Sequence, residues 1–208
     1  MPYRLLLCLI VFVYTTHSYA HPHSWIGNEL KVNGEGSQVD SITMTWTFDP
    51  FSSAYALDGD FSVFDNQQSA QKEALRLMRN LLNTHYFTYL YAGDAPLKFR
   101  LPEVYSLSRK GRRMVLNFTL PLSRLVELDK EDLDIQVFDN TYYIDISWKN
   151  HSTITLDSAL SSDCSFDLIT PTPSQDIVDY AMSLGVDDVG DDDLGSHFSQ
   201  KVSLTCGS

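Results

Sequence analysis

The sequence predicts an α+β fold, mainly antiparallel β-sheet with one main helix and a shorter C-terminal helix. Many short segments alternate apolar and polar residues, which is the period of a half-buried strand. Two segments instead repeat their apolar residues at helical spacing, one in the first half of the chain and one near its end. The sequence contains no repeat of fixed period and no Ser/Gly-rich linker, and we therefore expect one domain.

The predicted elements follow one another with turn signals between them. The cleanest strand covers 39–48, where Ile, Met, Trp and Phe alternate with Ser and Thr until an Asp-Pro pair ends it. The main helix covers 73–82 and is expected to begin near 66–69, and the C-terminal helix covers 174–184. The other predicted strands cover 24–32, 86–92, 97–100, 104–108, 114–120, 154–156, 164–169 and 202–206.

Two further segments are read from their turn residues. We expect 134–138 and 142–148 to form a strand pair around the Asp-Asn-Thr turn at 139–141. Residues 186–193 contain five aspartates and are the expected mobile loop. The acids there lack the every-second-position spacing of a calcium loop, so we expect a solvated loop.

The first 20 residues have the features of a secretory signal peptide. A short basic segment precedes an apolar run of about ten residues, and Ser18 and Ala20 fit an A-x-A-like cleavage site. Such a run is too short to span a bilayer, which needs about 20 residues. We therefore expect a signal peptide at 1–20 that is cleaved after Ala20. Residues 21–208 would then form a single periplasmic domain, soluble and not embedded in the membrane.

Charge and cysteine content narrow the class of protein. The formal net charge is −12, and it becomes −13 when the expected signal peptide, which contains Arg4, is removed. A chain this acidic is not expected to bind nucleic acid or anionic lipid. Of the three cysteines, Cys8 lies in the leader, which leaves Cys164 and Cys206. An even pair in an exported protein predicts a disulfide, and the alternative is a two-thiolate metal site.

The expected cleavage places His21 at the head of the mature chain and His23 two residues later. In an extended segment residues two apart point to the same side, so both imidazoles can bind one ion. Pro22 has no amide N–H, which excludes the copper motif that deprotonates the second amide. The remaining modes are chelation by the amine and ring of His21, or two-imidazole binding completed by other side chains. The alternative is a frayed polar terminus.

Two aspartates at predicted strand ends are candidates to complete such a site. Asp49 follows one strand and Asp139 follows another, and carboxylates can complete a zinc, nickel or cobalt shell. The alternative is that each aspartate bonds nearby amides in a turn. His85, His151 and His197 are expected to be ordinary surface or packed histidines.

The sequence carries no nucleophile elbow, phosphate loop, dinucleotide fingerprint or zinc-protease helix motif, and we expect no enzymatic activity. Other short motifs recur in a specific order. They are His21-Pro22-His23-Ser24-Trp25-Ile26, Trp46-Thr47-Phe48-Asp49, Tyr86-Phe87-Thr88, Phe118-Thr119-Leu120-Pro121-Leu122, Asp139-Asn140-Thr141-Tyr142-Tyr143, Cys164, and a closing segment from Phe198 to Cys206.

With these motifs the mature chain resembles a periplasmic family named for the substrate-binding component of ABC transporters. Its members are typically found beside nickel, cobalt or zinc transport and efflux proteins, which implies a metal-related role. By this resemblance, His21 and His23 correspond to the histidine motif of the family, and Asp49 and Asp139 correspond to two of its acidic residues. An Asp-rich insertion of the family is reduced here to the residues 58–60, so calcium binding is not expected.

The leading hypothesis is a periplasmic, non-enzymatic protein that binds a divalent metal ion for a membrane metal transporter or ABC transporter components. The ligands would be His21 and His23, with Asp49 and Asp139 completing the shell. Zinc or nickel/cobalt is favoured over copper because no methionine-rich or thiolate set accompanies the imidazoles. One alternative is a histidine-brace copper protein or oxidase, with a third nitrogen from another histidine (His85 or His151). Another is an envelope interaction module without metal.

Overall fold

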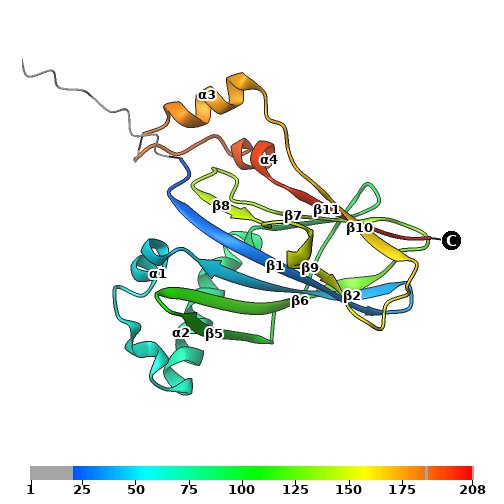
Figure 1. Cartoon of the computed structure of the whole chain (residues 1–208), viewed down its shortest axis with the longest axis horizontal. Coiled ribbons are helices and arrows are strands. Elements are labelled where there is room, and N and C mark those ends of the chain that lie inside the picture. The colour runs from blue at the N-terminus through cyan, green and yellow to red at the C-terminus, as the bar shows by residue number, and fades with distance from the viewer. Residues whose placement is uncertain (1–20, 186, 208) are drawn as a thin grey trace, which may run out of the picture.

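The computed structural model describes residues 21–185 and 187–207, and two β-sheets form its centre (Figure 1). The first sheet has the strand order β5-β6-β2-β1-β8, with β9 also paired to β1, and the second has the order β10-β11-β7-β3-β4. The first consists of β1 (Ser24–Glu35), β2 (Gln38–Phe48), β5 (Tyr105–Lys110), β6 (Arg113–Glu127), β8 (Ile144–Ser147) and β9 (Ile154–Leu156). The second consists of β3 (Thr88–Ala92), β4 (Ala95–Leu97), β7 (Leu133–Val137), β10 (Cys164–Ile169) and β11 (Lys201–Cys206). The predicted signal peptide lies outside the described residues.

One apolar core lies between the two sheets. Ile42, Met44 and Trp46 on β2 are fully buried, as their alternation with threonine predicts. Leu133 and Ile135 on β7 are equally buried and belong to the same apolar cluster. Because β2 and β7 are central strands of different sheets, the inner faces of the two sheets pack against each other.

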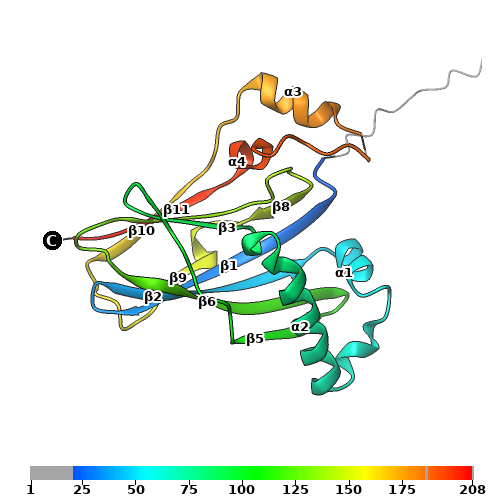
Figure 2. The ribbon, with the colours of Figure 1, turned by 180° about the vertical axis from the view of Figure 1, so that it is seen from behind.

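The two predicted helices are confirmed. The main helix, α2 (Gln67–Leu82), begins after Asn66, whose side-chain oxygen accepts a hydrogen bond from the Ser69 N–H at 2.8 Å. It lies against β5 (Figure 2). The C-terminal helix, α3 (Gln175–Ser183), begins after Ser174, whose side chain caps it in the same way. Helices and mainly antiparallel sheet together confirm the α+β class.

Two short helices were not predicted. α1 (Pro50–Ala56) directly follows β2, and α4 (Leu194–Phe198) directly precedes β11. The Asp-Pro pair that ends β2 also starts α1, because proline fits the first helical turn and an aspartate fits the N-cap. Single-turn 3₁₀ helices cover Phe61–Phe64, His85–Phe87 and His151–Thr153.

The prediction that 134–138 and 142–148 pair with each other is wrong. β7 pairs with β3 and β11 in the second sheet, whereas β8 pairs in parallel with β1 in the first sheet. Alternation of apolar residues specifies which face of a strand is buried but not which strand it pairs with. Residues 138–143 therefore connect one sheet to the other, and they reach the start of β1.

The strand predicted at 97–100 is displaced toward the N-terminus. β4 ends at Leu97, and Phe99 makes only an isolated bridge with Leu122. β6 is longer than predicted and continues through Pro121 as far as Glu127, with a register shift against β2. A proline is tolerated in this sheet because the pairing is irregular at that point.

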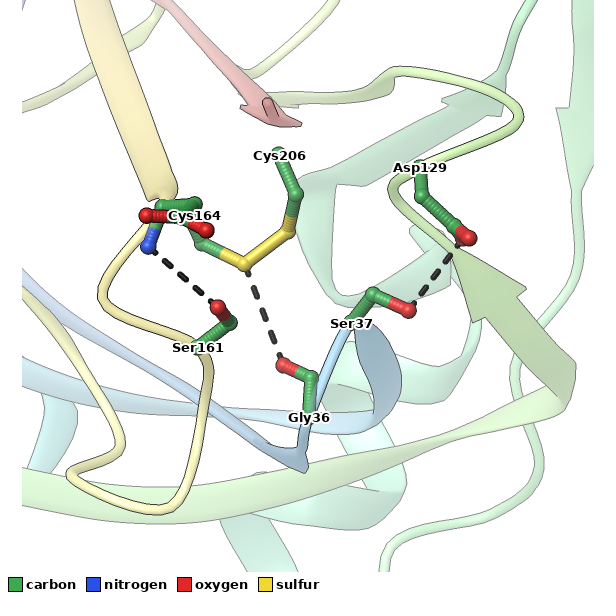
Figure 3. The surroundings of a disulfide bond; sticks show 7 residues. Gly36, Ser37, Asp129, Ser161, Cys164 and Cys206 are labelled. Atoms are coloured by element: carbon green, nitrogen blue, oxygen red, sulfur yellow. Dashed lines mark hydrogen bonds between the residues drawn. A yellow bond between two sulfur atoms is a disulfide. The ribbon is translucent and has the colours of Figure 1, made fainter. Parts of the chain in front are cut away.

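The predicted disulfide between Cys164 and Cys206 is confirmed (Figure 3). The two cysteines lie directly opposite each other on β10 and β11. The Sγ of Cys164 lies 3.8 Å from the carbonyl oxygen of Gly36, in the turn that follows β1. The hydroxyl of Ser37 in the same turn donates to Asp129 at 3.2 Å, so this end of the molecule joins both sheets. A disulfide is typical of a protein outside the cytoplasm.

No helix among the described residues has the length and apolar character needed to cross a membrane.

Candidate metal centre

His21 and His23 lie next to each other at the start of β1. Their ring centroids are 4.8 Å apart and the rings are nearly perpendicular. Both ring nitrogens of His21 and the Nε2 of His23 are buried, and none has a hydrogen-bond partner among the described residues. Each unpaired buried polar atom costs about 1–3 kcal/mol, and neutral imidazole nitrogen is a common metal ligand. A bound ligand would give these nitrogens the partner that the described part of the chain does not supply.

The connection between β7 and β8 holds the two imidazoles in place. The backbone N–H of His23 donates to the carbonyl oxygen of Tyr143 at 2.9 Å. The Tyr143 ring stacks on the His23 ring at a centroid distance of 4.6 Å and meets the His21 ring edge-on at 5.8 Å. The sequence-based interpretation missed this role of Tyr143, because it expected the residue within a hairpin strand.

Asp139 shapes this connection. Its carboxylate accepts hydrogen bonds from the backbone N–H groups of Thr141, Tyr143 and Ile144 at 3.1–3.2 Å, and from the hydroxyl of Thr141. These bonds turn the chain so that Tyr143 lies against the imidazoles and β8 begins beside β1. Asp139 thus acts as a turn residue in the structure, and it could bind a metal only by giving up amide hydrogen bonds.

Asp49 is the N-cap of α1 and lies beside β1. Its carboxylate accepts hydrogen bonds from the N–H groups of Phe51 at 2.8 Å and Ser52 at 3.0 Å, and from the N–H of Trp25 at 3.2 Å. Burial by itself would raise the pKa of Asp49, but the hydrogen bonds from Ser52, Trp25 and Phe51 outweigh it and lower the pKa. The structure thus gives Asp49 the turn role, and its ionised carboxylate attaches α1 to β1.

The surroundings of His21 favour a neutral ring and a nearby cation. Burial lowers the pKa of His21, and the adjacent His23 lowers it further, whereas Asp188 and Asp139 act in the opposite direction. A neutral imidazole keeps a free lone pair for a metal ion at pH 7. The two carboxylates add negative potential at the same place, which attracts cations.

Two glycines, Gly190 before α4 and Gly195 within it, lie close to the 139–141 turn. A Cβ on Gly195 would lie 1.8 Å from the carbonyl oxygen of Asp139, and one on Gly190 would lie 2.5 Å from that of Thr141. The backbone can approach this closely only because both residues lack a side chain. Of the loop expected at 186–193, residue 186 lies outside the described residues, and Gly190 is buried against the 139–141 turn.

The other histidines lie apart from the pair. His85 is the first of three successive residues with φ near +50° and lines a cavity of about 400 Å³ together with Asp139. The His151 ring stacks on Phe166 at 5.9 Å, and His197 is exposed on α4. Within 21–185 and 187–207, no three His, Cys, Asp or Glu side chains are grouped so that they could hold a metal ion.

Comparisons with known proteins identify a family. Residues 6–206 match the family described as "Protein of unknown function (DUF1007)". The chain is also similar to a protein of Haemophilus influenzae that carries the name "Uncharacterized protein". The two are 33% identical over 213 residues, which covers 98% of each chain. These matches show common ancestry along almost the whole length.

Proposed function

This chain belongs to the DUF1007 family, and we propose from its own residues that it binds a divalent metal ion in the periplasm for a membrane metal transporter. The observation that carries the proposal is a set of three buried imidazole nitrogens on His21 and His23 that have no hydrogen-bond partner within 21–185 and 187–207. Leaving them unpaired costs free energy, and a metal ion would offset that cost.

The ligands would be the rings of His21 and His23, joined by the amine of His21 if the chain is cleaved after Ala20. A bound ion would act here as cargo, and the protein residues would hold it and release it. Zinc or nickel/cobalt suits imidazole ligands, whereas copper(I) prefers thiolate or thioether sulfur. Cys164 and Cys206 form a disulfide and offer no thiolate, which also argues against the two-thiolate alternative.

Transfer to a transporter fits the position of these ligands. They lie just before β1 begins at Ser24, where the chain enters the sheet, and they are not part of the apolar core cluster. Tyr143 packs against both rings but remains 42% exposed, so a partner protein can reach this edge of the site. Ligands at such an edge can be replaced one at a time by those of an acceptor.

The test is a titration of the exported protein with zinc, nickel, cobalt and copper, after intact mass has established that His21 is the first residue. The His21→Ala/His23→Ala double variant is expected to lose about 100-fold or more in zinc affinity. A matched control, His151→Ala/His197→Ala, removes two exposed imidazoles elsewhere and should bind zinc like the unmodified protein. Equal zinc affinity in both double variants would contradict the proposal, and copper-dependent turnover with peroxide would favour the histidine brace.

A further inference from the structure

A cavity of about 480 Å³ lies directly beside the imidazole pair, between the start of β1, the end of β2, α1 and the start of β8. Figure 1 shows α1 next to the beginning of β1 at this end of the molecule. Its lining includes His23, Ser24, Phe51, Ser52, Tyr55 and Tyr143. Its size is that of a site for a small organic molecule, and its lining is mostly aromatic and aliphatic.

The aromatic wall on α1 is rigidly placed although it is open to solvent. Phe51 and Tyr55 are 75% and 81% exposed, four residues apart on one helix. Hydrogen bonds of Asp49 and of the buried Ser53 attach α1 to the rest of the fold. The hydroxyl of Ser53 donates to the Asp49 carbonyl oxygen at 2.7 Å and accepts the N–H of Met114 at 2.9 Å. Two aromatic rings on one fixed helix at the rim of a cavity are suited to hold a flat apolar molecule.

Polar groups of this cavity lie on one side. The hydroxyls of Ser24 and Ser52 hydrogen-bond each other at 2.7 Å, and His23 lies next to Ser24 in the chain. His23 therefore belongs both to the imidazole pair and to the cavity wall. Tyr143 also belongs to both, because its ring stacks on His23 and the residue lines the cavity.

The protein offers the ion fewer donors than it needs. Two imidazoles and one amine supply three nitrogens, whereas zinc takes four ligands and nickel often takes more. The carboxylates of Asp49 and Asp139 are engaged by backbone amides. The remaining ligands must therefore come from outside the protein, and the adjoining space is apolar rather than acidic.

We infer that the site takes its metal ion as a complex with a small, largely apolar organic chelator. The body of the chelator would occupy the cavity between α1 and Tyr143, and its donor atoms would complete the shell begun by His21 and His23. This inference rests on the proposed function and specifies its substrate as a metal chelate.

The test compares zinc alone with two zinc complexes, one of 1,10-phenanthroline and one of the polar chelator ethylenediamine. The phenanthroline complex is expected to bind at least about tenfold more tightly than the ethylenediamine complex, because its rings can enter the cavity. Phe51→Ala/Tyr55→Ala should remove that preference and leave the affinity for zinc alone unchanged. Leu101→Ala/Val104→Ala, which removes two exposed apolar side chains elsewhere, should retain the preference.

Each other result overturns the inference. If zinc alone binds and the two complexes bind equally, the chelate inference fails and the metal site stands. If phenanthroline without zinc binds as tightly as its complex, the cavity takes apolar molecules independently of the metal. If the Phe51/Tyr55 variant keeps the preference, the cavity does not provide it. If no zinc species binds, the proposed function fails together with the inference.

Discussion

The two ends of β1 lie in opposite kinds of surroundings. β1 is 12 residues long, about 40 Å, with the histidines at its start and the disulfide beside its end. At the disulfide end, Cys164 and Cys206 are covalently joined, and the exposed Lys31 pairs with Asp157 at 2.8 Å. At the histidine end, three imidazole nitrogens find no hydrogen-bond partner in the part of the chain that the structure describes, and aromatic rings face solvent.

This contrast indicates that one end of the molecule stabilises the fold and the other end carries the proposed binding site. Unpaired buried groups and exposed aromatic rings destabilise a fold unless a ligand covers them. Binding sites commonly carry such destabilising features, and the rest of the fold offsets them. In this protein the disulfide and the core between the sheets provide the stability that offsets these features. A ligand would stabilise the fold most at the histidine end.

The largest expected effect on stability comes from Cys164→Ser/Cys206→Ser. The cysteines are 42 residues apart, and the loss of this cross-link should lower the free energy of unfolding by about 4 kcal/mol. Urea titration measures the loss. Zinc affinity in native buffer should stay the same, because the site lies at the other end of β1. A parallel loss of zinc affinity would show that the two ends are coupled.

The next largest effect is expected for Gly195→Ala at the histidine end. The added Cβ would meet the carbonyl oxygen of Asp139 at 1.8 Å and push the connection that holds Tyr143. We expect a loss of about 1–3 kcal/mol in stability and about tenfold in zinc affinity. Gly27→Ala on β1 is the control, because its Cβ meets only an ordinary contact at 3.9 Å. Unchanged zinc affinity in Gly195→Ala would separate α4 from the metal site.

Tyr143→Ala should act mainly on the site and little on the fold. The ring stacks on His23 but is 42% exposed, so its removal should cost less than 1 kcal/mol of stability, on the order of one aromatic contact. Groups that orient a metal ligand typically change affinity about 10–100-fold. Tyr143→Phe keeps the stacked ring and should retain zinc affinity. If the phenylalanine variant binds as weakly as the alanine variant, the hydroxyl rather than the stacking matters.

The smallest expected effect concerns Asp145 on β8, next to the histidine end. Burial raises the pKa of Asp145, which a hydrogen bond from Ser147 only partly offsets, and burial together with Asp145 raises the pKa of Tyr142 to about 12. Because folding raises the pKa of this carboxyl, the folded state becomes less stable as the pH rises above 3.8, the pKa of the group in the unfolded chain. Asp145→Asn should therefore raise the melting temperature at pH 7, and this gain should disappear below about pH 3.8. A lower melting temperature at pH 7 would mean that the carboxylate is stabilised by the fold.

Sequence patterns predicted the elements whose cause is local. The main helix followed from its apolar period, and its start was expected near 66–69, where Asn66 caps it in the structure. The disulfide followed from the two cysteines that remain outside the expected signal peptide. The proximity of His21 and His23 was expected from their two-residue spacing, and their ring centroids are 4.8 Å apart, although residues 21–23 are not part of a strand.

The pairing of β7 and β8 with strands of different sheets could not be predicted in this way. Both strands show the same alternation that a hairpin would show, and the pattern does not name a partner. The turn and ligand interpretations of Asp49 and Asp139 were equally open, because an aspartate at a strand end serves either purpose. The amides that engage both carboxylates come from the folded backbone around them.

The sequence by itself determined the α+β class, the helices at 67–82 and 175–183, the cross-link and the adjacency of two imidazoles. These depend on residue periods, on spacing along the chain and on simple counts. Only the tertiary structure decided that Tyr143 packs against these imidazoles, that Gly190 and Gly195 pack against the 139–141 turn, and that an apolar cavity adjoins His23. Those contacts join segments that are distant in the sequence, and tertiary packing, which no local pattern encodes, brings them together.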